Sequence, residues 1–177
     1  MTARDLLSEA DRFLAADERR LPCVEGPPWD CFRSGGDWMR HTLMELRSRP
    51  PAAAEVDFTK LGFMKYGLAL GPALLVLLLA AATKTICLLL AAPIVFYTIE
   101  SSMVFLFPVA IDGSRSPIRD SRRLARKAGS PWKVTTTVMG LAAFMLLGGL
   151  RDGRFLRCWT LGCLCVLLWY EKVRTAG

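Results

Sequence analysis

Glu100 is the residue whose position most strongly suggests chemistry. It lies in an uncharged stretch from Thr85 to Ile111, with fifteen uncharged residues before it and eleven after it. At a rise of about 1.5 Å per residue, its carboxyl would lie on the order of 16–23 Å from either end of a helix over this stretch. A carboxylate so deep in hydrocarbon is costly and by default marks a functional site.

Tyr97 lies three residues before Glu100, on the same face of a helix, and could hydrogen-bond to its carboxyl. No basic residue falls in the same membrane layer of the spans predicted below, so we expect this carboxyl to be unpaired and protonated. A protonated carboxyl suits a general acid or a proton carrier. It equally suits an interhelical hydrogen bond, which Glu100→Gln would preserve.

A basic loop forms the second group of residues. Between Asp112 and Lys133 the chain carries seven basic residues and two acidic ones. Each Lys or Arg next to a membrane span contributes about 1 kcal/mol of attraction to anionic lipid headgroups. The loop therefore predicts headgroup contact and a topology signal. The candidate lipid- or phosphate-binding residues are Arg115, Arg119, Arg122, Arg123, Arg126 and Lys127.

The same loop supports an enzymatic alternative. Arginines can grip the phosphate or pyrophosphate of a lipid-linked substrate in bidentate geometry. Asp112, at the boundary between the apolar stretch and the loop, would then hold a metal or position a hydroxyl. Glu100, Tyr97 and Asp112 are the candidate catalytic residues of this alternative.

The cysteines and the single histidine predict no metal site and no cofactor. Cys23, Cys31 and His41 have no zinc-binding spacing. The other four cysteines fall in apolar segments, where Cys behaves as a small apolar residue: Cys87, Cys158, Cys163 and Cys165. We also expect no nucleic-acid partner, because a juxtamembrane location already explains the basic residues.

Four apolar segments must position these residues. A spanning helix needs roughly 17–25 apolar residues, and the predicted spans cover about 66–83, 85–111, 134–150 and 155–170. The fourth is short, but Trp159 and the Trp169-Tyr170 pair give it an aromatic belt. We predict an all-α integral membrane protein with four transmembrane helices as two hairpins over residues 61–177.

Smaller signals refine these spans. Gly67 and Gly71 form a small-residue pair that predicts close helix packing in the first span. Pro93 and Pro108 predict a bent second span around Glu100. In the basic loop, 112–133, Ser116 and Pro117 predict the start of a short helix, and Gly129 with Pro131 predicts its end.

Residues 1–60 predict a small helical cytoplasmic extension, too short to bury a sizeable core alone. A first helix would run from a Thr2 cap to about Arg20, and a loop would cover 22–36. Asp37 would then cap a second helix that runs to about Ser48, and a linker would follow. The apolar face of the first helix contains Leu6, Leu7, Ala10, Phe13 and Leu14. It could lie on the bilayer, pack on the second helix or dock a partner, and its mixed charges favour protein contact.

The positive-inside rule places loop 112–133 in the cytoplasm, and therefore both termini as well. We predict a multi-pass protein of the cell inner membrane that acts as an accessory factor or subunit. It would contact anionic lipid headgroups and a protein partner or a second copy. Two alternatives remain. One is a small enzyme that acts on a lipid or lipid-linked phosphate with Glu100 as acid, and the other is a proton-coupled small transporter. The sequence therefore leaves enzymatic activity open.

Overall fold

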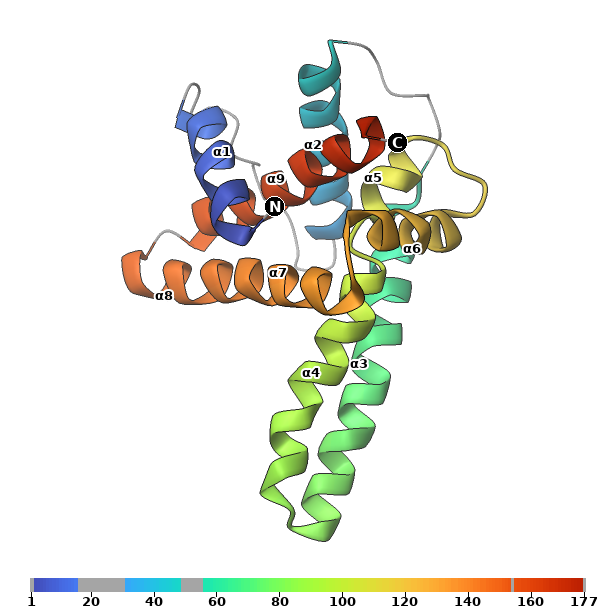
Figure 1. Cartoon of the computed structure of the whole chain (residues 1–177), viewed down its shortest axis with the longest axis vertical. Coiled ribbons are helices and arrows are strands. Elements are labelled where there is room, and N and C mark those ends of the chain that lie inside the picture. The colour runs from blue at the N-terminus through green and yellow to red at the C-terminus, as the bar shows by residue number, and fades with distance from the viewer. Residues whose placement is uncertain (1, 16–30, 49–55, 154, 177) are drawn as a thin grey trace.

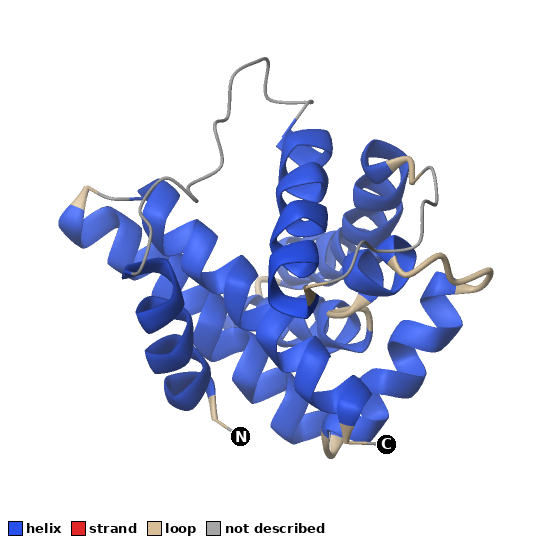
Figure 2. Cartoon of the chain, turned by 90° about the horizontal axis from the view of Figure 1, so that it is seen from above, coloured by secondary structure: helices blue, strands red, loops and turns tan. Residues whose placement is uncertain are grey.

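The computed structural model describes residues 2–15, 31–48, 56–153 and 155–176, and this part of the chain is helical. Its helices form a body from which one long pair projects (Figure 1). Seen from above, short loops connect most of them (Figure 2). The elements are α1 (Ala3–Ala15), α2 (Cys31–Arg47), α3 (Phe58–Thr83), α4 (Ile86–Ser102), α5 (Leu106–Ile111), α6 (Pro117–Ala128), α7 (Pro131–Ala143), the π-helix η3 (Phe144–Gly148), α8 (Gly149–Asp152) and α9 (Phe155–Thr175).

The projecting pair is the helical hairpin α3–α4. Lys84 turns the chain with a left-handed backbone conformation (φ 54°), and its N–H is bonded to the carbonyl of Ala80. Small residues bring the two helices together, since Ala69, Ala73 and Ala92 are buried. Leucines cover the outside of the hairpin and leave it apolar on its exposed faces: Leu74, Leu75, Leu78, Leu79, Leu89 and Leu90.

The glycine pair of the first span does not make this contact. A Cβ built on Gly67 or Gly71 meets nothing within 4 Å, so both glycines face outward. Alanines at the same spacing form the interface instead, and the sequence-based prediction was wrong about which small residues meet the neighbouring helix.

The second span is interrupted before Pro108 but not at Pro93, whereas the sequence predicted a bend from both prolines. α4 continues through Pro93, but it ends at Ser102, and α5 begins at Leu106. Pro108 has no N–H to donate to the carbonyl of Val104, so a continuous helix would lose that bond. The break turns Phe105 into the body, where it is fully buried and its ring lies 5.3 Å edge-on from that of Trp169.

α9, the predicted fourth span, is the central helix of the body. Ten of its 21 residues are buried, and α1, α2, α6, α7 and η3 pack around it. An apolar helix that is buried on most sides can be a core helix as readily as a span. The predicted arrangement as two spanning hairpins is therefore not confirmed.

Among the described residues, three helical stretches are long and apolar enough to cross a membrane: Phe58–Thr83, Ile86–Ile111 and Pro131–Arg151. The third consists of α7, η3 and α8, and it runs across the base of the hairpin rather than along it (Figure 1). A buried hydrogen bond of 2.9 Å between the hydroxyls of Ser101 and Thr135 joins α4 to α7 at this crossing.

The two N-terminal helices belong to the body. Thr2 caps α1, since its hydroxyl accepts a bond from the N–H of Asp5, as predicted. Leu6, Ala10 and Leu14 are almost fully buried, and α1 packs on α9 and α7. The apolar face of α1 is thus covered within the chain and does not await a bilayer or a partner.

α2 begins earlier than the sequence predicts. The helix starts at Cys31 and not at Asp37, so the predicted loop 22–36 is wrong for residues 31–36. Of the two glycines that suggested a turn, Gly36 has a packing role, because a Cβ there would lie 2.2 Å from the ring of Phe58, whereas a Cβ on Gly35 would meet nothing within 4 Å. Residues 22–30, the end of the first predicted helix at 16–20 and the linker around residues 50–54 lie outside the described residues.

Candidate lipid-headgroup site

The basic residues of the predicted loop gather on α6. The helix starts at Pro117, after Ser116, and its C-cap is Gly129, as the sequence predicts. Ser121 and Ala125 are buried toward the body, and a spacing of four residues places them on one face. The remaining circumference carries the basic side chains, all of them exposed.

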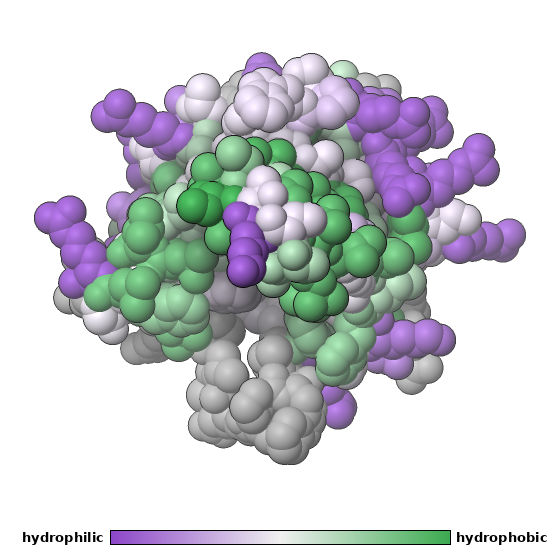
Figure 3. Space-filling model, turned by 90° about the horizontal axis from the view of Figure 1, so that it is seen from below, coloured by the Kyte–Doolittle hydropathy of each residue, from purple (hydrophilic) through white to green (hydrophobic). Residues whose placement is uncertain are grey.

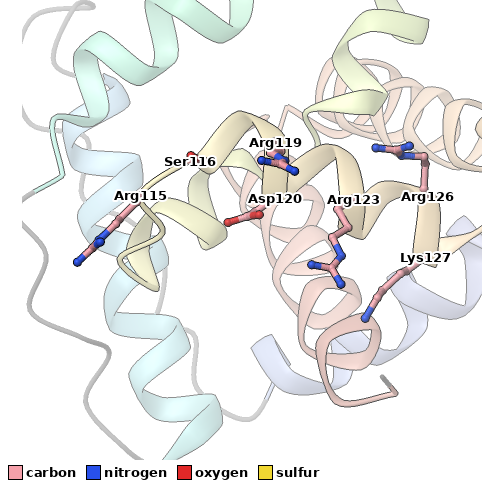
Figure 4. Close-up of a pocket in the computed structure, with 7 residues that line it drawn as sticks. All are labelled: Arg115, Ser116, Arg119, Asp120, Arg123, Arg126 and Lys127. Atoms are coloured by element: carbon pink, nitrogen blue, oxygen red, sulfur yellow. The ribbon is translucent and has the colours of Figure 1, made fainter.

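Four of these side chains and that of Arg115, which lies just before the helix, line an open hollow of about 720 Å³ together with Ser116 and Asp120. The four are Arg119, Arg123, Arg126 and Lys127 (Figure 4). The carboxylate of Asp120 accepts a hydrogen bond of 2.6 Å from Ser114. Within the described part of the chain, no basic side chain on α6 forms an ion pair. The hollow therefore presents cations to solvent and suits an anion such as phosphate.

A second, smaller hollow lies between α6, α7 and α4. It measures about 190 Å³, and Arg122 and Arg126 line it together with the hydroxyl residues Thr98, Ser101 and Ser102. Arg122 is the candidate that does not line the larger hollow. The structure thus places all six basic candidates on or beside one short helix, next to the base of the apolar hairpin.

Asp112 does not join this basic group. Arg47 of α2 donates to both oxygens of Asp112, with Nη2 to Oδ2 at 3.0 Å, and to the carboxylate of Glu171. The hydroxyl of Tyr170 donates to Asp112 at 2.5 Å. This cluster, Arg47–Asp112–Tyr170–Glu171, ties α2 and the loop before α6 to the C-terminal part of α9.

The cluster predicts a dependence of stability on acid pH. Burial alone would raise the pKa of Asp112, but the hydrogen bonds from Arg47 and Tyr170 and the charge of Arg47 hold it below its ordinary value. Such a carboxylate stabilises the fold above its unfolded pKa of about 3.9, and the contribution is lost as pH falls through the lower, folded pKa. We expect thermal unfolding curves to show a steep loss of stability below about pH 4, and Asp112→Asn to flatten that loss. Equal slopes in the two proteins would contradict this role.

Glu100 is paired, contrary to the expectation from the sequence. The ammonium nitrogen of Lys65 on α3 lies 2.8 Å from its Oε1, and the two side chains are only 7% and 12% exposed. The pair lies where the hairpin enters the body, since residues of α7 and α9 line the same pocket. The carboxylate is therefore neither unpaired nor in the middle of an isolated span.

Glu100 and Tyr97 line one pocket of about 290 Å³, as their spacing predicts. Neither Asp112 nor any of the six basic candidates lines this pocket. The structure thus separates the residues that the enzymatic alternative would combine. No group of His, Cys, Asp and Glu within the described residues has a metal-binding arrangement.

The sequence did not reveal the partners of Glu100 and Asp112. Lys65 immediately precedes the predicted first span, so it was placed outside the membrane layer. In an antiparallel hairpin, however, residues at similar distances from the turn lie at similar heights: Lys65 is 19 residues before Lys84 and Glu100 is 16 after it. Arg47 gave no such signal, because its contact with Asp112 spans 65 residues.

Comparisons with models of protein families, with curated proteins and with solved structures give no match. The function of the chain must therefore be argued from its own geometry.

Proposed function

We propose that the chain is a membrane-anchored accessory or subunit protein that inserts the hairpin α3–α4 into a bilayer and binds anionic lipid phosphates with α6. The observation that carries this proposal is the set of unpaired basic side chains on α6, beside the base of an apolar hairpin. Cations in this position would lie at the depth of the headgroups.

The dimensions of the hairpin fit this arrangement. From Gly67 to Thr83, α3 has seventeen residues, which reach about 26 Å. The hydrocarbon core of a bilayer is about 30 Å thick. The first and last helices, α1 and α9, lie in the body, away from the hairpin tip (Figure 1), so they would share one side of the membrane. The positive-inside rule makes that side the cytoplasm.

The helices that cross the hairpin base would rest on the membrane surface. Along α7, η3 and α8, Trp132, Leu147 and Leu150 are 70%, 66% and 79% exposed. Seen from the hairpin side, apolar side chains gather around and to the left of the hairpin, and hydrophilic ones project most densely at the right edge, where α6 lies (Figure 3). This distribution supports an in-plane, interfacial helix better than a third crossing.

A protein partner remains part of the proposal, but it would need a different surface from the one expected. The apolar face of α1 packs on α9 and is already buried. On the cytoplasmic side, a partner would contact the polar outer faces of α1 and α2. The membrane anchor and the headgroup contact do not depend on this partner.

The headgroup contact can be measured on the detergent-purified protein with two soluble short-chain lipids, dioctanoyl phosphatidylglycerol and dioctanoyl phosphatidylcholine. We expect the anionic lipid to bind more tightly. Replacing Arg119, Arg123 and Arg126 together with Gln should raise its Kd on the order of 100-fold, because each charge contributes about 1 kcal/mol.

The matched control replaces three exposed arginines of α1 and α2 with Gln: Arg4, Arg12 and Arg33. This variant has the same net charge as the α6 variant but keeps the α6 hollow intact. An equal loss of binding in both variants would mean that net charge alone causes the effect. Unchanged binding in the α6 variant would mean that the basic residues of α6 serve only as a topology signal.

A further inference from the structure

The pocket around Lys65 and Glu100 has the composition of a site for an apolar ligand. Its volume is about 290 Å³, near the lower end of ligand sites. Most of its walls are apolar or aromatic, contributed by α3, α4, α5, α7, η3 and α9. The polar groups are few: the ion pair Lys65–Glu100, the hydroxyls of Tyr66 and Tyr97, and the thiol of Cys163.

The pocket is connected to the apolar outside of the protein. Leu146 in η3 and Trp159 on α9 line it and are exposed, and Phe96 on the hairpin lines it and is half-buried. Seen from below, an apolar surface surrounds the hairpin (Figure 3). A ligand would therefore enter from the hydrocarbon side, where lipid chains are the available molecules.

The floor of the pocket is shaped by two unusual features. In η3 the chain forms a π-helical turn, which often marks a functional position. Gly162 lies opposite, where a Cβ would be only 2.3 Å from the sulfur of Met145. The missing side chain lets Met145 lie against α9.

The ion pair determines which polar group of a ligand can bind beside it. An ammonium group has three N–H donors, and Glu100 accepts from one of those of Lys65 at 2.8 Å. The pair has no net charge, so a ligand carboxylate would meet the charge of Glu100 and a ligand cation that of Lys65. A neutral carbonyl accepts a remaining N–H without either repulsion.

We propose that this pocket binds one acyl chain of a membrane glycerolipid, with the ester carbonyl of that chain accepting a hydrogen bond from Lys65. The site is distinct from α6, because the two pockets share no lining residue. It would hold a lipid tail whether or not α6 holds a headgroup. The bound chain would complete the packing between the hairpin base and α7.

Photo-crosslinking in vesicles tests this site. The protein is reconstituted with diacylglycerol or phosphatidylcholine whose acyl chain carries a diazirine, irradiated, and mapped by peptide mass spectrometry. We expect labels on Cys163 and Val166 of α9 in addition to the leucines of the hairpin. The hairpin leucines Leu75 and Leu78 are exposed, so their labelling is the internal reference.

Two matched variants locate the labelled site. Ala142 lines the pocket, whereas its neighbour Ala143 is exposed and does not. Ala142→Phe should reduce the ratio of α9 to hairpin labelling by roughly tenfold, because it fills the space for the ligand. Ala143→Phe should leave the ratio unchanged. If Ala142→Phe does not fold, as judged by circular dichroism, Val166→Phe blocks the pocket from the α9 side.

The outcomes are distinct. If both lipids label α9, the pocket recognises the acyl chain and its ester and not the headgroup. If diacylglycerol alone labels α9, diacylglycerol is the glycerolipid that supplies the bound chain. A diazirine fatty acid, offered as its methyl ester and as its free acid, should label α9 more strongly as the ester. Absence of α9 labelling, equal labelling in the pocket-filled variant, or preference for the free acid would overturn the proposal.

Discussion

Replacing Lys65 with methionine should destabilise the protein by about 3–5 kcal/mol, because it leaves the carboxylate of Glu100 buried without its partner. The two side chains lie 2.8 Å apart and are nearly inaccessible to solvent. Glu100→Gln should have a comparable effect by leaving the ammonium group unpaired. This reverses the expectation that an unpaired Glu100 would tolerate the amide.

The double variant Lys65→Met/Glu100→Met provides the decisive comparison. Replacing both members of a buried ion pair with apolar residues of similar size is often neutral or even stabilising by about 1–4 kcal/mol. Unfolding of the detergent-purified proteins should therefore show a double variant more stable than either single variant. Lys60→Met, an exposed change on the same helix, should stay within about 0.5 kcal/mol of the wild type. A double variant as unstable as the sum of the two would show that the residues do not interact.

Replacing Arg47 with methionine should have the second large effect, about 3 kcal/mol, because it leaves Asp112 and Glu171 without the guanidinium that joins them. For a chain of this size, that loss corresponds to a decrease in Tm of roughly 6–12 °C. Arg33→Met, an exposed change on the same helix, is the control and should have little effect.

The change of Tm with pH shows whether Arg47 stabilises the fold through its charge or only through the packing of its aliphatic chain. Without Arg47, the guanidinium no longer offsets the burial of Asp112, so the folded pKa of Asp112 rises above its unfolded value. Groups with a raised folded pKa gain stability as pH falls. The Tm of Arg47→Met should therefore approach that of the wild type between neutral pH and about pH 4.5. A constant difference over this range would mean that only packing was lost.

The local sequence determined the helix ends and helix faces that depend only on residues close by in the chain. Thr2, Pro117 and Gly129 mark helix ends because caps, a first-turn proline and a C-cap glycine act within one turn of the chain. The hairpin turn at Lys84 and the basic surface of α6 follow in the same way. The uncharged leucine-rich stretch of α3 could also be predicted as a membrane span, because a helix that crosses a bilayer needs only sufficient length and an apolar composition.

Only the tertiary structure decided which apolar helices face one another and which remain exposed. The uncharged run 158–170 made α9 a candidate span beside the hairpin helices, yet α9 is surrounded by the body and α3 projects from it. Composition reports how much apolar surface a helix must hide, and does not report whether protein or lipid hides it. The partners of the charged groups were hidden for a related reason: Arg47 meets Asp112 across 65 residues and Lys65 meets Glu100 across a hairpin. Such contacts form because burial makes an unpaired charge costly, and the packing of the helices selects the partner.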